Sequence, residues 1–180
     1  MKKVKPHILP AVRSMKDLEK LIKTDYTSCV LLDMHVGHVK SIIELLNKHH
    51  VGFYLHVDLI KGMSHDEFAC EYLIQTYKPK GIISTKTKVI NKAKSLGTTT
   101  VFRVFILDSQ ALQRSIQLIK RVEPDLVEVL PGIATKAINI INKETQTDVI
   151  AGGLINEVEE VDLAIENGAR YITTSARTLW

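Results

Sequence analysis

Residues 53–85 read FYLHVDLIKGMSHDEFACEYLIQTYKPKGIIST, and this stretch holds one complete unit of the fold. It opens with an apolar run at Phe53–Leu59 and closes with another at Gly81–Thr85. Between them, Asp66–Tyr77 carries apolar residues three and four positions apart, which is the spacing of an amphipathic helix. Pro79 cannot continue that helix. The pattern therefore predicts a strand, a helix and a second strand.

The same alternation continues in both directions along the chain. Further strands are predicted at Ile8–Val12, Cys29–Met34, Thr100–Leu107, Leu126–Leu130, Val149–Ala151 and Tyr171–Thr174. Further helices are predicted at Met15–Lys23, Val39–His49, Lys88–Ser95, Ala111–Val122, Thr135–Glu144 and Glu157–Asn167. Successive strands begin about 19–28 residues apart, as repeated strand–helix units require.

Eight strands and seven helices are most simply arranged as an α/β protein with a single (β/α) barrel of the TIM type. The sequence ends at Trp180, so the last helix is expected to be missing or vestigial. An open, doubly wound sheet remains the alternative. Residues 1–180 contain no linker and no low-complexity tract, so we expect one barrel domain.

The composition is that of an ordinary globular protein with a mildly basic balance. Lysine and arginine number 24 against 20 acidic residues, which is compatible with an acidic partner but does not require one. The two cysteines, Cys29 and Cys70, make neither a disulfide framework nor a zinc spacing. The basic start carries Pro10 in a short apolar stretch, unlike a signal peptide, and no run is long enough to span a bilayer. A cytoplasmic protein without membrane contact is expected.

Side chains alternate along a strand, so residue parity separates its two faces. In Phe53–Leu59 the odd-numbered residues are all apolar and are expected to pack beneath the helices. The even-numbered residues are polar and are expected to face the barrel interior. The interior sets predicted in this way are Tyr54, His56 and Asp58; Leu31, Asp33 and His35; Val101, Arg103 and Phe105; and Leu126, Glu128 and Leu130.

The polar members of these sets are predicted to converge on one interior. They are Asp33, His35, His56, Asp58, Arg103 and Glu128. Because an unpaired buried charge is costly, such groups either pair with one another or meet a polar ligand. Ligand sites in this fold lie at the carboxyl ends of the strands, where most of these residues fall. Two short patterns, Asp-x-His and His-x-Asp, offer metal ligands, but nothing fixes their geometry, so we expect no metal and no cofactor.

The last two strands end in loops suited to an anion. Ala151-Gly-Gly-Leu-Ile155 ends the seventh strand and Thr173-Thr-Ser-Ala176 ends the eighth. Glycines let backbone N–H groups approach a phosphate closely, and a hydroxyl adds a further donor. We therefore expect Gly152, Gly153 and Ser175 to bind a phosphate. The chain has neither a GxxxxGK[ST] loop nor a GxGxxG fingerprint, which argues against a nucleotide hydrolase or a dinucleotide enzyme.

With these loops in place, the chain resembles the glycerol-3-phosphate-responsive antiterminators, which regulate glycerol-utilisation operons. The segments that carry the resemblance are Ile8-Leu-Pro-Ala11, Leu55-His-Val-Asp-Leu-Ile-Lys-Gly62, Gly81-Ile-Ile-Ser-Thr85, Glu128-Val-Leu-Pro-Gly132, Ala151-Gly-Gly-Leu-Ile155, Thr173-Thr-Ser175 and Leu179-Trp180. The resemblance implies a barrel that binds glycerol 3-phosphate and contacts leader mRNA, so that polymerase reads past a terminator. One position departs from the family pattern, since Ala176 stands where an asparagine is expected.

The chemistry of further polar residues predicts roles toward this ligand and this partner. The ligand's hydroxyl end, or the closure of its site, is expected to involve Asp33, His56, Asp58, Lys61, Arg103 and Glu128. From Tyr72 to Leu107 the chain has no acidic residue, and the lysines expected to form an RNA-facing patch there are Lys86, Lys88, Lys92 and Lys94. The alternatives are a solvated lysine-rich helix face and, for the first of these lysines, a role at the ligand.

Two functions remain open at the level of sequence. The first is a ligand-responsive regulator that binds RNA and catalyses nothing. The second is a phosphate-handling barrel enzyme such as an isomerase, an aldolase or a phosphodiesterase, because fold alone does not choose between them. No nucleophile with a base and an orienting group can be assigned, so the regulator is the preferred prediction.

Overall fold

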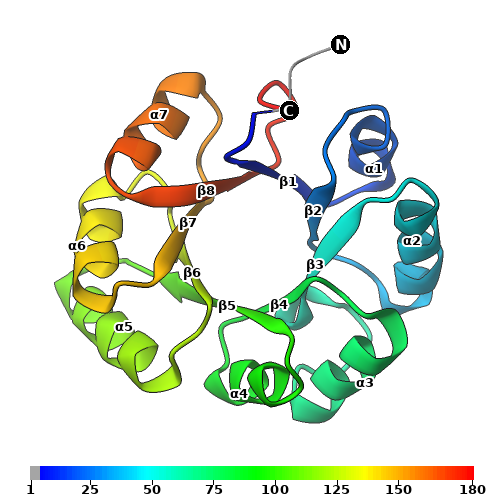
Figure 1. The fold of residues 1–180 in the computed structure, drawn as a ribbon, viewed down its shortest axis with the longest axis horizontal. Coiled ribbons are helices and arrows are strands. Elements are labelled where there is room, and N and C mark those ends of the chain that lie inside the picture. The colour runs from blue at the N-terminus through cyan, green and yellow to red at the C-terminus, as the bar shows by residue number, and fades with distance from the viewer. Residues whose placement is uncertain (1–4) are drawn as a thin grey trace.

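Eight parallel strands close into one barrel, in the order β1 to β8 (Figure 1). The computed structural model describes residues 5–180, so residues 1–4, in the basic start of the chain, lie outside the description. The strands are β1 Ile8–Val12, β2 Ser28–Leu31, β3 Gly52–His56, β4 Gly81–Ser84, β5 Thr99–Phe105, β6 Leu126–Leu130, β7 Asp148–Gly152 and β8 Ala169–Thr174.

The helices form a ring around the barrel (Figure 1). They are α1 Met15–Leu21, α2 Val36–Lys48, α3 Glu67–Tyr77, α4 Thr87–Ser95, α5 Ser109–Val122, α6 Thr135–Thr145 and α7 Val158–Glu166. A 3-10 turn at Val57–Leu59 follows β3. The predicted TIM-type barrel with seven helices is confirmed, and the open sheet is excluded. Among residues 5–180, no helix combines the length and the apolar character needed to cross a bilayer.

The strand register gathers distant polar residues at one end of the barrel. Arg103 pairs with Glu128 between β5 and β6, and Gly152 pairs with Thr173 between β7 and β8. The barrel closes where Leu9 of β1 pairs with Thr173. Residues that the sequence places in separate repeats thus become neighbours around the carboxyl end.

Apolar side chains form two layers, one inside the barrel and one between the barrel and the helices. The inner layer contains Ala11, Val30, Leu32, Ile83, Val101, Leu126 and Ile150. The outer layer is larger and takes the alternate strand residues together with one stripe of each helix, as in α2 with Val39, Ile42, Ile43 and Leu46. Each strand is therefore buried on both faces, which explains why the strands read as nearly continuous apolar runs.

The second strand faces the opposite way from the sequence-based prediction. Leu31 packs in the outer layer, whereas Val30 and Leu32 lie inside the barrel. β2 ends at Leu31, and the chain then passes through Asp33, whose φ of 54° lies in the left-handed region. Residue parity does not predict on which side Asp33 and His35 lie, because side chains alternate between the two faces only while the strand continues.

Two other face assignments are also wrong. Leu59 packs against the inner layer and not beneath the helices, because β3 ends at His56 and the 3-10 turn rotates the chain. Phe105 does not fill the interior: it is the last residue of β5, at the open end of the barrel, and is 49% exposed.

The carboxyl-terminal residues occupy the place of an eighth helix. In Figure 1 the C-terminus lies near β1, between α7 and α1. Leu179 and Trp180 are buried in the outer layer, and the indole N–H of Trp180 donates to the carbonyl of Thr174 at 2.9 Å. This short tail covers the closing strands and holds the end of β8 in place.

Candidate ligand-binding site

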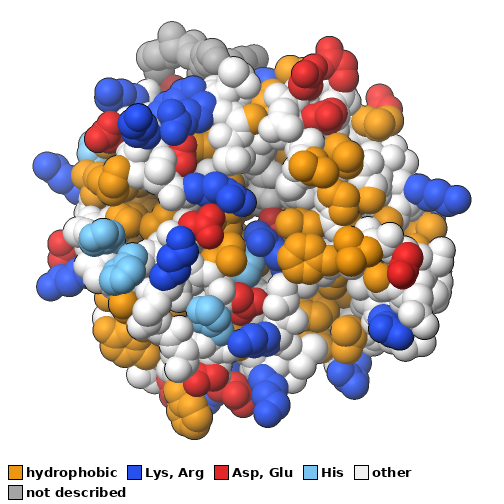
Figure 2. All heavy atoms as spheres, turned by 180° about the vertical axis from the view of Figure 1, so that it is seen from behind, with side chains coloured by type: hydrophobic (Ala, Val, Ile, Leu, Met, Phe, Trp, Pro, Cys, Tyr) orange, Lys and Arg blue, Asp and Glu red, His pale blue; other side chains and the backbone are white. Residues whose placement is uncertain are grey.

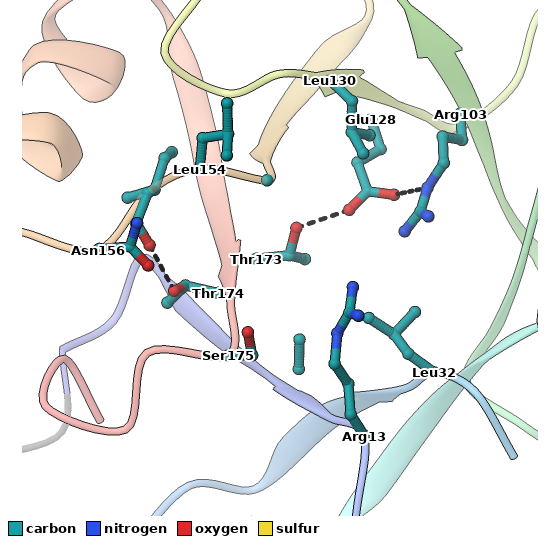
Figure 3. A pocket seen from close by; sticks show the side chains of 13 residues that line it. Arg13, Leu32, Arg103, Glu128, Leu130, Leu154, Asn156, Thr173, Thr174 and Ser175 are labelled. Carbon is teal, nitrogen blue, oxygen red and sulfur yellow. Dashed lines mark hydrogen bonds and ion pairs between the residues drawn. The ribbon is translucent and has the colours of Figure 1, made fainter.

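A pocket of about 80 Å³ opens at the carboxyl ends of the strands (Figure 3). Its lining comes from β1, β2, β5, β6 and β8 and from the loop after β7. The lining residues are Ala11, Arg13, Leu32, Arg103, Glu128, Leu130, Gly153, Leu154, Ile155, Asn156, Thr173, Thr174 and Ser175. This is the end of the barrel at which TIM-type proteins bind their ligands.

A buried ion pair forms the floor of the pocket. Nε of Arg103 donates to Oε2 of Glu128 at 2.7 Å, and the hydroxyl of Thr173 donates to Oε1 at 2.6 Å. The two charged side chains are only 9% and 1% exposed, so each needs the other to offset its lost hydration. Both oxygens of Glu128 are thus engaged, whereas the terminal nitrogens of Arg103 face the open space of the pocket (Figure 3).

Gly152 leaves room for this ion pair. A Cβ at Gly152 would lie 2.6 Å from both Oε1 of Glu128 and Oγ1 of Thr173, which is closer than a side chain can approach. Gly152 itself is buried in β7 and stands behind the pocket lining. Of the three residues expected at a phosphate, Gly153 and Ser175 line the pocket directly, and Gly153 has a φ of 76° that favours glycine.

The loop after β8 is tied to its neighbours by hydrogen bonds. The hydroxyl of Thr174, the last residue of β8, donates to the carbonyl of Ile155 at 2.7 Å, which joins the end of β8 to the loop after β7. The same hydroxyl accepts the amide of Ala176 at 3.0 Å. Together with the indole of Trp180 on the Thr174 carbonyl, these bonds fix Ser175 at the rim of the pocket.

The buried carboxylate of Asp17 joins the loops after β1 and β8. It accepts from the amide of Arg13 at 3.0 Å, from the hydroxyl of Ser14 at 2.9 Å and from Nε of Arg177 at 2.6 Å. Burial alone would raise the pKa of Asp17, but these hydrogen bonds outweigh it and lower the pKa. The loop that contains Arg13 and the tail that contains Ser175 are therefore held together by one ionised carboxylate, that of Asp17.

Arg13 is the main lining residue that sequence reasoning missed. It follows β1 directly, and its guanidinium points toward the same space as that of Arg103 (Figure 3). Its Nη1 also lies 3.2 Å from Oδ2 of Asp33. The signal was present in the sequence, because Arg13 directly follows the first predicted strand, Ile8–Val12, and ligand sites in this fold lie at the carboxyl ends of the strands.

His56 and Asp58 lie inside or beside the barrel, outside the pocket lining. Neither ring nitrogen of His56 has a hydrogen-bond partner among residues 5–180, although the residue is 2% exposed. Burial, and then the charge of Arg103, lowers the pKa of His56 to about 3, so the ring is neutral. Asp58 accepts from the hydroxyl of Ser84 at 2.6 Å and twice from Thr85 at 2.7 Å, and these bonds lower its pKa against the effect of burial. Asp58 thereby joins the turn after β3 to the end of β4.

Asp33 and Lys61 line a neighbouring pocket together with Arg13. Lys61 is exposed, and its backbone pairs with His35 in a short parallel bridge. The structure thus brings Arg103 and Glu128 into the ligand pocket and leaves Asp33 and Lys61 beside it. Within the described part of the chain, no group of three or more His, Cys, Asp and Glu side chains is arranged to hold a metal ion.

The lysines of the expected RNA patch lie on and before α4, and three of them have partners. Nζ of Lys86 donates to the carbonyl of His65 at 2.8 Å. Lys92 pairs with Glu71 of α3 at 3.1 Å. Lys94 lies 3.7 Å from a carboxylate oxygen of Glu123 and also donates to backbone carbonyls. Lys88 is exposed on the same helix.

Comparison with known proteins gives one consistent family. The model of the family described as "Glycerol-3-phosphate responsive antiterminator" matches residues 8–180. The crystal structure of the glycerol uptake operon antiterminator regulatory protein from Listeria monocytogenes str. 4b F2365 is 36% identical, with a TM-score of 0.94 over 100% of this chain and 97% of that one. A glycerol uptake operon antiterminator-related protein from Thermotoga maritima MSB8 is 29% identical, with a TM-score of 0.86 over 98% and 99%.

A curated relative covers nearly the same length. An uncharacterized protein of Escherichia coli (strain K12) is 28% identical over 174 residues, which is 95% of this chain and 91% of that protein. The family match spans the whole barrel, from the first residue of β1 to the last residue of the chain. This protein therefore belongs to the glycerol-3-phosphate responsive antiterminator family.

Proposed function

We propose that this protein binds glycerol 3-phosphate in the pocket at the ends of β7 and β8, and that it contacts leader mRNA of glycerol-utilisation operons as an antiterminator. The observation that carries the proposal is a small pocket with two guanidinium groups directed into it, those of Arg13 and Arg103. Among the described residues only one carboxylate, that of Glu128, lines it, so the pocket favours an anion.

The phosphate is assigned to the rim formed by Gly153 and Ser175, with Gly152 behind them. A glycine at a φ of 76° leaves its backbone open to close approach, and the hydroxyl of Ser175 adds a donor. The guanidinium of Arg13 reaches the same space from β1 and supplies charge. Family membership supports the identity of the ligand.

The hydroxyl end of the ligand is assigned to the polar groups deeper in the barrel. Glu128 and Arg103 line the pocket, and His56 lies beside Arg103 with both nitrogens unused by residues 5–180. A buried polar atom without a partner is costly, so a hydroxyl that reached His56 would relieve that cost. Asp33, Asp58 and Lys61 are proposed to shape or close the site from its edges, since they lie outside the lining.

The proposed role is sensing without catalysis. No lysine stands among the described residues that line the pocket, so none is placed there to form a Schiff base as an aldolase requires. Glu128 is engaged by Arg103 and Thr173 on both oxygens, so it is poorly placed to act as a general base. A regulator of transcription also implies a cytoplasmic location and a single regulatory domain over residues 1–180.

The RNA surface is proposed to include Lys86, Lys88, Lys92 and Lys94. Lys88 and Lys92 are four residues apart on α4 and can face one strand together. The ion pair with Glu71 reduces the charge that Lys92 presents, so Lys88 carries more of the expected contact.

Three measurements test this function together. Calorimetry with glycerol 3-phosphate should show binding at one site, and product analysis after long incubation should show the ligand unchanged. A gel shift with leader RNA should then respond to the ligand. Turnover of glycerol 3-phosphate would favour the enzyme alternative, and absence of binding would exclude glycerol 3-phosphate as the ligand.

A further inference from the structure

A second pocket adjoins the ligand pocket and shares Arg13 with it. It encloses about 200 Å³ between the loops after β1 and β2 and the residues after β3. We call it the histidine pocket, and define it by its four basic lining side chains, Arg13, His35, His38 and Lys61. Among residues 5–180, the one carboxylate in its lining is Asp33, which is paired with Arg13 at 3.2 Å.

His35 presents a hydrogen-bond donor in this pocket. Its Nδ1 accepts the amide of Gly37 at 3.1 Å, so Nε2 is the ring nitrogen that is left to donate. The ring of His38 lies beside it, with centroids 5.6 Å apart. The amide of Val36 is bonded to the carbonyl of Lys61 at 2.9 Å, so the start of α2 has few free amides and the donors here are side chains.

The basic groups are held together by backbone bonds. The amide of Lys61 donates to the carbonyl of Met34 at 2.8 Å, and the Lys61 carbonyl accepts from Val36. These two bonds form the parallel bridge that places Lys61 beside His35. The backbone that carries His35 and Lys61 is thus fixed before an anion binds, which lowers the entropic cost of binding.

We propose that the histidine pocket binds a backbone phosphate of RNA, an inference that rests on the proposed function. The side chain of Arg13 is 55% exposed, and His35, His38 and Lys61 are exposed as well. The ligand pocket, by contrast, rests on the buried pair of Arg103 and Glu128. A buried floor suits a small molecule, whereas an open basic pocket suits one phosphate of a longer strand.

The surrounding surface favours a polyanion over a single ion. Figure 2 shows an end of the barrel where the histidine side chains gather on one half, together with several lysine and arginine side chains and with acidic side chains among them. Lys86, which follows β4, lies beyond the loops that form the histidine pocket, and its Nζ is bonded to the carbonyl of His65. We expect an RNA strand bound at the histidine pocket to extend toward Lys86 and α4.

Arg13 connects the two pockets electrostatically. It lines both, and its present partner is Asp33. A phosphate in the ligand pocket competes with Asp33 for this guanidinium, because both are anions within its reach. Ligand binding therefore changes the charge that Arg13 and Asp33 present to RNA, which couples the two sites.

The test compares two double variants of the full-length protein. In Lys61→Ala/His38→Ala two of the four basic side chains of the pocket are removed without touching His35, which caps α2. The matched control is Lys48→Ala/His49→Ala, which removes the same residue types, both exposed, from the other end of α2. Fluorescence anisotropy with labelled leader RNA and with a uridine oligonucleotide measures affinity at several salt concentrations, and calorimetry measures glycerol 3-phosphate binding.

The pocket variant should bind both RNAs more than tenfold more weakly, which is about 1.4 kcal/mol. The slope of log K against log salt should become shallower by about 0.7 for each RNA phosphate that the variant no longer neutralises. Glycerol 3-phosphate binding, to which Lys61 is proposed to contribute from the edge of the site, should weaken by less than RNA binding does. If the pocket variant binds RNA with the affinity and salt slope of the control, the inference is wrong while the proposed function stands.

Two other outcomes also overturn the inference. If the wild-type protein binds neither RNA, both this inference and the RNA role of the protein fail. If calorimetry with inorganic phosphate finds one bound phosphate fewer in the pocket variant while RNA affinity is unchanged, the pocket serves a free phosphate and not RNA.

Discussion

Arg177 lies 160 positions after Asp17 in the chain, yet its Nε is 2.6 Å from Oδ1 of that buried carboxylate. The same carboxylate accepts the amide of Arg13. One ionised side chain thus links the loop after β1, which carries Arg13, to the tail after β8, which carries Ser175. We expect the geometry of the candidate pocket to depend on this link, although Asp17 itself does not line the pocket.

Asp17→Asn should therefore weaken glycerol 3-phosphate binding without removing a direct interaction with the ligand. It should also lower the free energy of unfolding by about 2 kcal/mol, because hydrogen bonds to a charged group disappear. The matched control is Glu19→Gln, which removes one exposed negative charge from the same helix. Calorimetry and urea unfolding measure both effects. Equal ligand affinity in the two variants would show that the link does not position the pocket.

His56 is expected to make the folded protein sensitive to acid. Its pKa is about 3 in the fold against 6.5 in an unfolded chain. Below pH 6.5 the unfolded chain therefore binds a proton that the folded protein does not, and stability falls as the pH drops from 6.5 toward 3. His56→Leu should flatten this part of the stability profile, measured by urea unfolding across that range. The exposed His49→Leu is the control, and an equal acid sensitivity in both variants would contradict the assignment.

Gly153→Val should abolish most glycerol 3-phosphate binding while leaving the protein folded. A Cβ at this position meets only Leu130 at 3.5 Å, so the cost to the fold is mainly the positive φ, about 1–2 kcal/mol. Gly97→Val is a matched control, because Gly97 has a φ of 70°, a Cβ there meets none of the described atoms within 4 Å, and it lies outside the pocket. Calorimetry on both variants separates backbone strain from damage to the site. Wild-type affinity in Gly153→Val would place the phosphate elsewhere.

Glu128→Ala should lower the free energy of unfolding by about 3–5 kcal/mol, because it leaves Arg103 buried without its carboxylate. The double variant Arg103→Met/Glu128→Leu should recover most of that stability, since neither charge of the pair remains buried. It should nevertheless fail to bind glycerol 3-phosphate. Denaturant unfolding measures stability, and calorimetry measures binding. A stable double variant that still binds the ligand would restrict the ion pair to a structural role.

Reversing Lys88 and Lys92 to glutamate should weaken leader RNA binding more than tenfold, about 1.4 kcal/mol or more. Glycerol 3-phosphate binding should barely change, because neither lysine lines the ligand pocket. The control is Lys136→Glu/Lys143→Glu, which makes the same charge change on α6. A gel shift near physiological salt compares the variants. If both double variants weaken RNA binding equally, the loss of affinity comes from the change in net charge and not from a patch on α4.

The barrel, and the end of it at which the candidate pocket lies, could be predicted from the sequence alone. Apolar runs at intervals of about 19–28 residues specify repeated strand–helix units, and this local periodicity survives in any packing of the chain. The loops of the ligand pocket could be predicted for the same reason: Gly153 and Ser175 follow the last two strands, whose carboxyl ends meet at one end of the barrel. Arg103 and Glu128 were assigned correctly to the interior by parity, because each lies inside its strand.

The pairing of these residues depends on the tertiary structure. Asp33 could not be placed from the sequence, because β2 ends two residues earlier. Asp33 itself has a φ in the left-handed region, so the chain changes direction there. The interaction of Asp17 with Arg177 joins opposite ends of the chain, so no local pattern records it. Strand periodicity is a property of neighbouring residues, whereas ion pairs and pocket walls depend on the register that closes β8 onto β1. That closure is a property of the folded chain as a whole.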